Sequence, residues 1–150
     1  MYQQLENYLV AKTRMDKETF QQIAPYFTLR KVKRKEVLLR PGEVCKHNYF
    51  INKGCLKFSS IHHDGKESIR HFAFENKFGT DLASFSKKTP SAESIEAIEN
   101  SEILAINRKD FFFLVDSVPA INLVYRDILE MAYITMQHRI YDFQGASALD

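Results

Sequence analysis

The side chains best suited to hold a metal ion lie in one short stretch of the sequence. That stretch contains His62, His63, Glu67 and His71. Imidazole nitrogens and a carboxylate are ligands that transition metals accept in enzymes. If the stretch forms a strand, however, His62 and His63 point to opposite faces and cannot both bind one metal. We therefore expect no metal site here, and a metal-dependent enzyme stays as an alternative.

The cysteines and serines offer little for covalent chemistry. Cys45 and Cys55 are too few for a disulfide framework or for a cysteine-bound iron–sulfur cluster. Neither lies in a sequence context that suggests an activated thiolate, and the chain has no Gly-x-Ser-x-Gly motif. These observations predict two buried free thiols and a protein that is not an enzyme, with no catalytic residues.

The composition is that of an ordinary globular chain. Of its 150 residues, 45% are hydrophobic and 27% are charged, and 21 basic against 19 acidic side chains give a net charge of +2. No run approaches the roughly 18–20 apolar residues that a membrane-spanning helix needs. The N-terminal segment is too polar for a secretion signal. We expect a cytoplasmic protein without a membrane partner.

Hydrophobic periodicity divides the chain into three zones. Residues 1–26 predict two short helices, the second capped by Asp16. Residues 27–106 alternate short apolar runs with turn signals, and Asp64-Gly65 predicts a hairpin with a type I′ turn. The remainder is helical. This order predicts a mainly β domain with flanking helices.

The last helix is long for a chain of this size. We expect it to run from about residue 119 to 143, with Gly145 stopping it inside a hinge of residues 144–150. Its apolar residues form two stripes, and only one of them can pack on the strands. We therefore predict a homodimer in which this helix pairs with its second copy. The expected interface positions are Ile121, Val124, Ile128, Met131 and Thr135, and the second stripe holds Leu129, Ala132 and Met136.

Several short motifs, taken in order, resemble those of one known family. They are Lys53-Gly54, Asp64-Gly65, Phe78–Phe85, Thr89–Ala92 and Ile95–Glu99. Over essentially the whole chain, the sequence resembles the sensor half of Crp/Fnr-type transcription regulators, the relatives of the catabolite activator protein. The resemblance implies a double-stranded β-helix (jelly roll) with two N-terminal helices and a long C-terminal dimerisation helix.

The resemblance also implies a domain layout. Residues 1–118 form a jelly-roll domain like those that bind cyclic nucleotides, with its flanking helices, and residues 119–143 form the dimerisation helix. Residues 144–150 form a hinge to a helix-turn-helix domain that is absent from this chain. Any contact with DNA is expected only through that absent domain.

A ligand site follows from the same resemblance. In family members that bind a cyclic nucleotide, a Gly-Glu-Leu motif and a later arginine hold the ribose and the cyclic phosphate. A hydroxyl does not neutralise a phosphate, and Ser91 stands where that arginine would be. We therefore expect no high-affinity binding of cyclic AMP. The positions that correspond to the site are Gly79, Thr80, Asp81, Leu82, Ser91 and Ala92.

Alternatives remain open from the sequence. An unknown small molecule could use the same pocket, with Arg70, Lys87 or Lys88 as a replacement cation. Haem would need His47 or His71 as an axial ligand, and we expect no cofactor. The remaining alternatives are a regulatory domain that does bind cyclic AMP or cyclic GMP, and a metal-dependent cupin-type enzyme.

Overall fold

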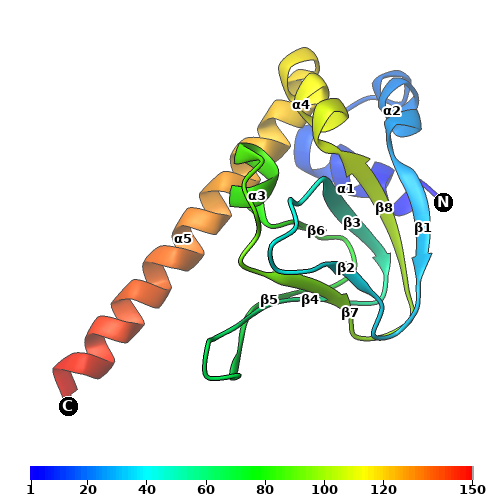
Figure 1. Cartoon of the computed structure of the whole chain (residues 1–150). Coiled ribbons are helices and arrows are strands. Elements are labelled where there is room, and N and C mark those ends of the chain that lie inside the picture. Colours follow the sequence, from blue (N-terminus) through cyan, green and yellow to red (C-terminus); the bar gives the residue numbers. More distant parts are fainter. Residues whose placement is uncertain (150) are drawn as a thin grey trace.

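Two antiparallel sheets stack to form the body of the molecule (Figure 1). The computed structural model describes residues 1–149, with side chains described up to residue 145. The first sheet, in the order β1-β8-β3-β6, consists of β1 (Thr28–Val32), β8 (Ser101–Asn107), β3 (His47–Lys53) and β6 (Phe78–Gly79). The second, in the order β2-β7-β4-β5, consists of β2 (Val37–Leu39), β7 (Ser94–Ala97), β4 (Leu56–Ile61) and β5 (Glu67–Ala73). The predicted jelly roll is confirmed.

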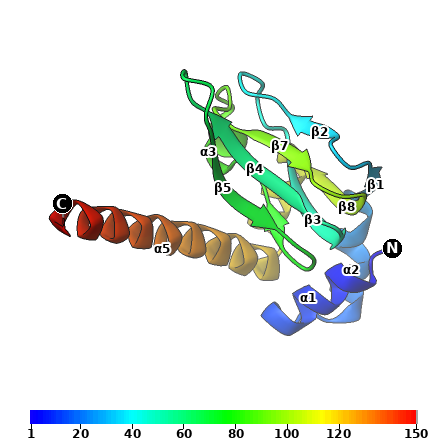
Figure 2. The same cartoon turned by 90° about the horizontal axis from the view of Figure 1, so that it is seen from below.

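Helices lie before, within and after the strands. They are α1 (Gln3–Thr13), α2 (Lys17–Ile23), the 3-10 helix η1 (Ala24–Tyr26), α3 (Leu82–Lys87), α4 (Arg108–Ser117) and α5 (Pro119–Leu149). Asp16 caps α2 as predicted, because its carboxylate accepts a hydrogen bond of 2.8 Å from the Thr19 amide. Figure 2 shows α5 leaving the body as a straight rod. None of the described helices is long and apolar enough to cross a membrane.

Aromatic contacts fasten the helices to the jelly roll. Phe50 of β3 meets Tyr8 of α1 with 5.5 Å between ring centroids. Phe111 of α4 lies 5.6 Å from the fully buried Phe85 of α3 and 5.8 Å from Tyr125 of α5. Such tilted and edge-on pairs stabilise a core beyond the area that they bury. The direction in which α5 leaves the body is therefore set by the core.

The β4–β5 hairpin has a different turn from the predicted one. A type I′ turn needs positive φ at both central residues, but Gly65 alone in this loop has positive φ, at +86°. The Gly65 amide donates to the His62 carbonyl at 2.9 Å, and the His62 amide donates to the Lys66 carbonyl at 2.8 Å. The predicted type I′ turn is wrong: the loop has three residues and ends with a glycine in the left-handed conformation.

A β-bulge interrupts the same hairpin. The ladder pairs Phe58 with His71 and then Ser59 with Ile69, which leaves Arg70 as the extra residue. A bulge re-aims the side chain of the extra residue. The guanidinium carbon of Arg70 accordingly lies 5.3 Å from the centroid of the buried Phe58 ring. The His71 ring lies on the same side, 5.9 Å from that ring.

Helix α5 differs from the sequence prediction in where it ends and in which of its residues are buried. It continues through Gly145 to Leu149 where a stop was predicted, because a glycine inside a helix costs only about 1 kcal/mol. Ile121 and Val124 are 3% and 2% exposed within the protomer. They pack on the chain's own core and cannot form the predicted dimer interface, while Ile128 is half-buried against the same core. Asp150, the last residue of the predicted hinge, lies outside the described residues.

Candidate functional site

The predicted ligand positions lie where β6, α3 and the loop before β7 follow one another. β6 ends at Gly79, and a Cβ atom at this position would lie 2.6 Å from Cζ of Phe58. Glycine is therefore required for β6 to pass this close to the aromatic ring. Thr80 and Asp81 then lead into α3, which begins at the half-buried Leu82.

Hydroxyl groups hold this segment against the start of β3. Thr80 Oγ1 donates to the His47 carbonyl at 2.8 Å and lies 3.2 Å from Sγ of Cys45. Ser84 Oγ donates to the Thr89 carbonyl at 2.6 Å and accepts from the Cys45 amide at 2.8 Å. These hydroxyls are therefore engaged inside the protein, and a ligand would have to displace existing partners.

Ser91 and Asp81 bond directly to each other. Ser91 is 4% exposed, and its Oγ donates to Oδ2 of Asp81 at 2.5 Å. The Glu93 amide donates to the same Oγ at 2.9 Å. The neighbouring Ala92 is exposed. Ser91 and Asp81, which the family resemblance relates to the phosphate-binding arginine and the ribose-binding glutamate, are thus bonded to each other.

A fixed positive charge reaches this region from Arg70 on β5. Its Nε and Nη2 lie 2.5 and 3.0 Å from the two carboxylate oxygens of Glu93, which makes a forked ion pair. Nη2 also lies 3.4 Å from the Thr80 carbonyl. On the opposite side, the Arg139 guanidinium of α5 donates a hydrogen bond to the Arg70 carbonyl. Arg70 therefore contacts the cassette loop, as we call residues 79–92, and, through its backbone, the long helix.

The charge around His71 is predominantly positive. Burial lowers the pKa of His71 below its ordinary value, and repulsion from Arg70, Arg139 and Lys77 acts in the same direction. Among the groups that shift this pKa, Glu93 is the one that raises it. Three cations and a single carboxylate thus act on this imidazole.

The residues considered as metal or haem ligands do not converge. His62 and His63 lie at the exposed end of the β4–β5 hairpin, whereas His71 packs on Phe58. His47 lies beside a tyrosine of β3. Within the described part of the chain, no three His, Cys, Asp or Glu side chains lie close enough together to hold a metal ion. The arrangement offers no ligand set for a cupin-type enzyme.

Both cysteines are free and buried, as predicted. Cys45 is 2% exposed and Cys55 is fully buried. Burial raises the pKa of the Cys55 thiol, with Glu99 and Glu75 acting in the same direction. Such a thiol is a poor nucleophile at neutral pH.

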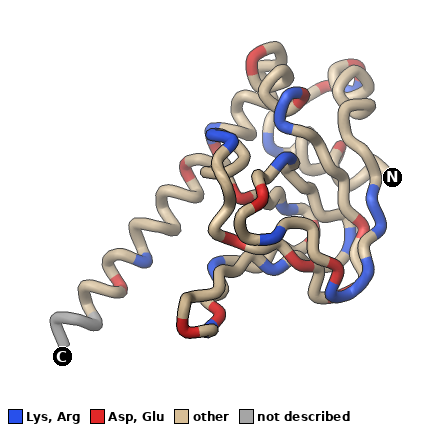
Figure 3. Tube along the Cα trace, viewed as in Figure 1, with Lys and Arg blue, Asp and Glu red and all other residues tan. Residues whose placement is uncertain are grey.

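The projecting part of α5 carries an exposed apolar seam. Arg139 and Asp142 are the charged residues between positions 131 and 145, and Figure 3 shows how sparse charge is along this part of the rod. Met131 and Thr135, which were predicted to form the interface, are exposed but lie on another side of the helix. The seam residues step by four and three and are at least 39% exposed: Leu129, Tyr133, Met136, Ile140 and Phe143.

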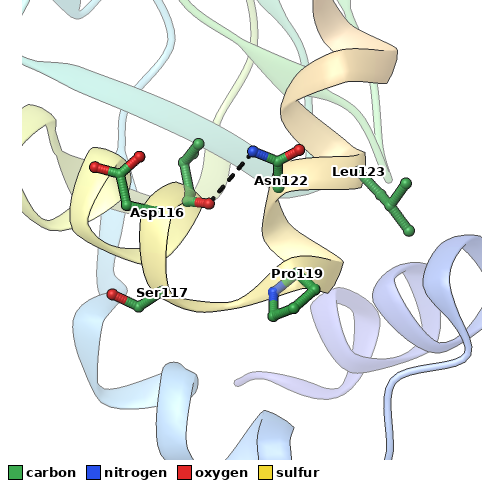
Figure 4. Close-up of a pocket in the computed structure, with 6 residues that line it drawn as sticks. Asp116, Ser117, Pro119, Asn122 and Leu123 are labelled. Atoms are coloured by element: carbon green, nitrogen blue, oxygen red, sulfur yellow. Dashed lines mark hydrogen bonds between the residues drawn. The ribbon is translucent and has the colours of Figure 1, made fainter.

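Two cavities lie at the base of α5, away from the cassette. The larger, of about 440 Å³, occupies the corner between α4 and α5 (Figure 4). There Asn122 donates to the Val115 carbonyl at 3.5 Å, and Asp116 is the one ionised group among the lining residues. The smaller, of about 220 Å³, lies beside the ion pair of Lys12 and Asp127 that joins α1 to α5. Neither is lined by the predicted ligand positions.

The two sheets, the α3 loop and the long last helix define a jelly-roll domain of the class found in regulatory proteins. Residues 29–117 match the family described as the cyclic nucleotide-binding domain. Because this match covers more than half of the chain, the protein belongs to that family. A comparison with curated proteins finds none whose sequence matches significantly.

Solved structures with the same fold include transcription regulators. The catabolite activator protein of Thermus thermophilus is 18% identical with a TM-score of 0.72, over 91% of this chain and 63% of that one. This chain thus spans less than two thirds of that regulator's length. The sensor domain of the regulator DNR from Pseudomonas aeruginosa is 18% identical with a TM-score of 0.70, over 93% and 90%. The predicted resemblance to Crp/Fnr-type regulators is confirmed at the level of fold.

The fold also occurs in kinase regulation. The regulatory subunit of a cAMP-independent protein kinase A from Trypanosoma brucei is 17% identical, with a TM-score of 0.67. The alignment covers 88% of this chain and 47% of that one. By its description, that protein is the regulatory subunit of a kinase that does not depend on cyclic AMP.

Sequence reasoning located the cassette loop but missed the ion pair beside it. Glu93 lies two residues after Ser91 and was not considered as a partner for the replacement cation Arg70. Of the other two candidate cations, Lys87 and Lys88 are exposed at the far end of α3. The opposite charges of Arg70 and Glu93 could have suggested an ion pair. The β-bulge that brings the two residues together, however, has no recognisable pattern in the sequence.

Proposed function

We propose that this protein is the sensor and dimerisation module of a Crp/Fnr-type transcription regulator. It acts without catalysis in the cytoplasm and reaches DNA through a helix-turn-helix domain that follows α5. The observation that carries this proposal is the combination of a cyclic nucleotide-binding fold with a projecting helix whose exposed face is apolar. The likeness to the DNR sensor domain, which spans nearly the same length, supports it.

The helix seam is the dimer interface in this proposal. A two-fold axis along α5 would bring Leu129, Met136 and Ile140 of one protomer against the same residues of its partner. Each such side chain contributes roughly 1.5–3 kcal/mol when it is fully buried. The steps of four and three between seam residues are those of helices that pair side by side. The seam therefore replaces the interface that the sequence predicted.

The ligand of the module is not cyclic AMP. In this proposal, a cyclic phosphate at the cassette would meet the carboxylate of Asp81 and the hydroxyl of Ser91, which bond to each other and carry no positive charge. An unneutralised phosphate is costly to remove from water. The guanidinium of Arg70 contacts the cassette at the Thr80 carbonyl, and no described contact joins it to Asp81 or Ser91.

Signal transfer would work by a shift in helix pairing. A ligand that prefers one arrangement of the paired α5 helices shifts the population toward that arrangement. Helix α5 contacts α4 through Phe111 and Tyr125 and contacts α1 through the Lys12–Asp127 ion pair, so a change at the jelly roll would reach the helix through these contacts.

Sedimentation velocity of the chain tests the proposal. At micromolar concentration the wild type should be a dimer. Met136→Asp should yield a monomer, because a charge in the middle of an apolar seam loses its hydration on pairing. Thr135→Asp adds the same charge one residue away, outside the seam, and should remain a dimer. A wild type that is monomeric throughout this range would contradict the proposal.

A further inference from the structure

We propose that Arg70 and Arg139 form the recognition point of this domain for a small oxyanion, a ligand bearing a carboxylate or phosphate group that takes the place of Glu93. This inference rests on the proposed sensor function and names the chemical class of the ligand. The anion-binding cations come from the β5 bulge and from α5, not from the loop that follows α3.

The bulge presents the Arg70 side chain in a form suited to an oxyanion. Its guanidinium stacks over the Phe58 ring at 5.3 Å and holds a carboxylate through two nitrogens. A guanidinium fork fits the paired oxygens of a carboxylate or a phosphate, and stacking on an aromatic ring fixes its plane. The side chain of Arg70 remains 41% exposed, so a solute can reach it.

In the structure, the carboxylate of Glu93 occupies the position at Arg70 that the ligand would take. Its carboxylate offers Arg70 the chemistry that a carboxylate ligand would offer, from the residue just before β7 begins at Ser94. Ion pairs that are partly open to water contribute little net free energy. For a ligand with similar oxygens to replace it, the Glu93 side chain, which is 15% exposed, has to turn toward water, and the affinity for the ligand is set by this competition.

The local charge favours an additional anion. Arg70, Arg139 and Lys77 act together on His71, opposed by Glu93 alone. Asp81 is engaged by Ser91 and does not face Arg70 in any described contact. A bound oxyanion would therefore be attracted by an excess of positive charge.

Arg139 connects this point to the dimer helix. It donates from α5 to the Arg70 carbonyl, which the bulge leaves outside the regular ladder. An anion that draws both guanidinium groups together would change the position of α5 relative to β5. The same contact thus provides the differential interaction that a ligand needs to shift a helix equilibrium.

Titration of the whole chain with inorganic phosphate, and separately with succinate, tests the proposal by NMR at constant ionic strength. Saturable shifts are expected at the amides of Arg70 and Glu93 and at the Arg139 side-chain nitrogens. Glu93→Gln removes the competing charge, and the dissociation constant of at least one probe should fall by about tenfold. Arg70→Gln should abolish the shifts. Glu18→Gln on α2 and Arg126→Gln on α5 are the matched controls and should behave as wild type.

The two probes and the variants together distinguish the possible results. Saturation by phosphate alone or by succinate alone identifies the class of ligand within the proposal. Equal shifts in wild type, Glu93→Gln and Arg70→Gln would overturn it, as would no saturable shift with either probe. If Arg70→Gln does not fold, Arg70→Lys keeps the charge without the fork and should bind at least several-fold more weakly than wild type. Sedimentation of the same samples distinguishes failure of this inference from failure of the proposed function. A dimer that binds neither probe refutes the oxyanion inference. A monomeric wild type refutes the proposed function.

Discussion

Ser91 donates a hydrogen bond of 2.5 Å to the carboxylate of Asp81, and this bond joins the two positions that the family resemblance relates to phosphate and ribose binding. Both groups lie at the cassette loop, and Ser91 is almost fully buried. A hydrogen bond to a charged acceptor is stronger than one between neutral groups. The loop is therefore held in place by a bond between its own side chains.

Removal of the Ser91 hydroxyl should destabilise the protein. Ser91→Ala leaves Asp81 and the Glu93 amide without this partner, and we expect a loss of about 1–3 kcal/mol in the free energy of unfolding. Urea denaturation measures it. Ser86→Ala is the control, because Ser86 Oγ is buried without a hydrogen-bond partner, and its removal should leave stability unchanged or raise it. Equal losses in the two variants would show that the Ser91–Asp81 bond does not hold the loop.

Two glycines should respond in opposite ways to alanine. A Cβ at Gly79 meets the Phe58 ring at 2.6 Å, and overpacking of this kind costs about 1–3 kcal/mol. Gly145 has no atom within 4 Å of its Cβ position and lies in α5. Gly145→Ala should therefore be neutral or stabilising. Thermal unfolding followed by circular dichroism distinguishes them, and a tolerated Gly79→Ala would contradict the close packing of β6.

Stability should fall on mild acidification. Burial lowers the pKa of His71 and of His47 below the ordinary value of 6.5. Between the native and unfolded pKa values the unfolded chain binds more protons, so the free energy of unfolding falls as the pH drops through that window. Denaturation at pH 7.5 and at pH 5.5 should show this loss, and it should be smaller in His47→Gln. The same substitution at the exposed His63 is the control; an unchanged slope in His47→Gln would exclude a contribution from His47.

The sequence allowed the fold to be predicted wherever local signals and burial agreed. The jelly roll, which the family resemblance implied, is confirmed by the two sheets. From local signals, Asp16 was expected to cap its helix and a hairpin was expected at Asp64-Gly65, and both are present. These features depend on short stretches of chain. They could be inferred because turn residues and caps act through their own backbone.

Features that depend on tertiary context could not be inferred in the same way. Helix α5 has two apolar stripes, and periodicity does not say which of them faces the chain's own body. The structure buries Ile121 and Val124 and exposes the seam around Met136. Likewise, the register shift that places Arg70 beside Glu93 arises from pairing between β4 and β5 rather than from either sequence alone.

The central proposal is that this domain does not bind cyclic AMP with high affinity. Isothermal titration calorimetry of the wild-type protein with cyclic AMP tests it most directly. We expect no saturable heat at ligand concentrations up to about 100 μM, because the Ser91 hydroxyl cannot neutralise a phosphate as an arginine would. A dissociation constant in the low micromolar range would contradict the account.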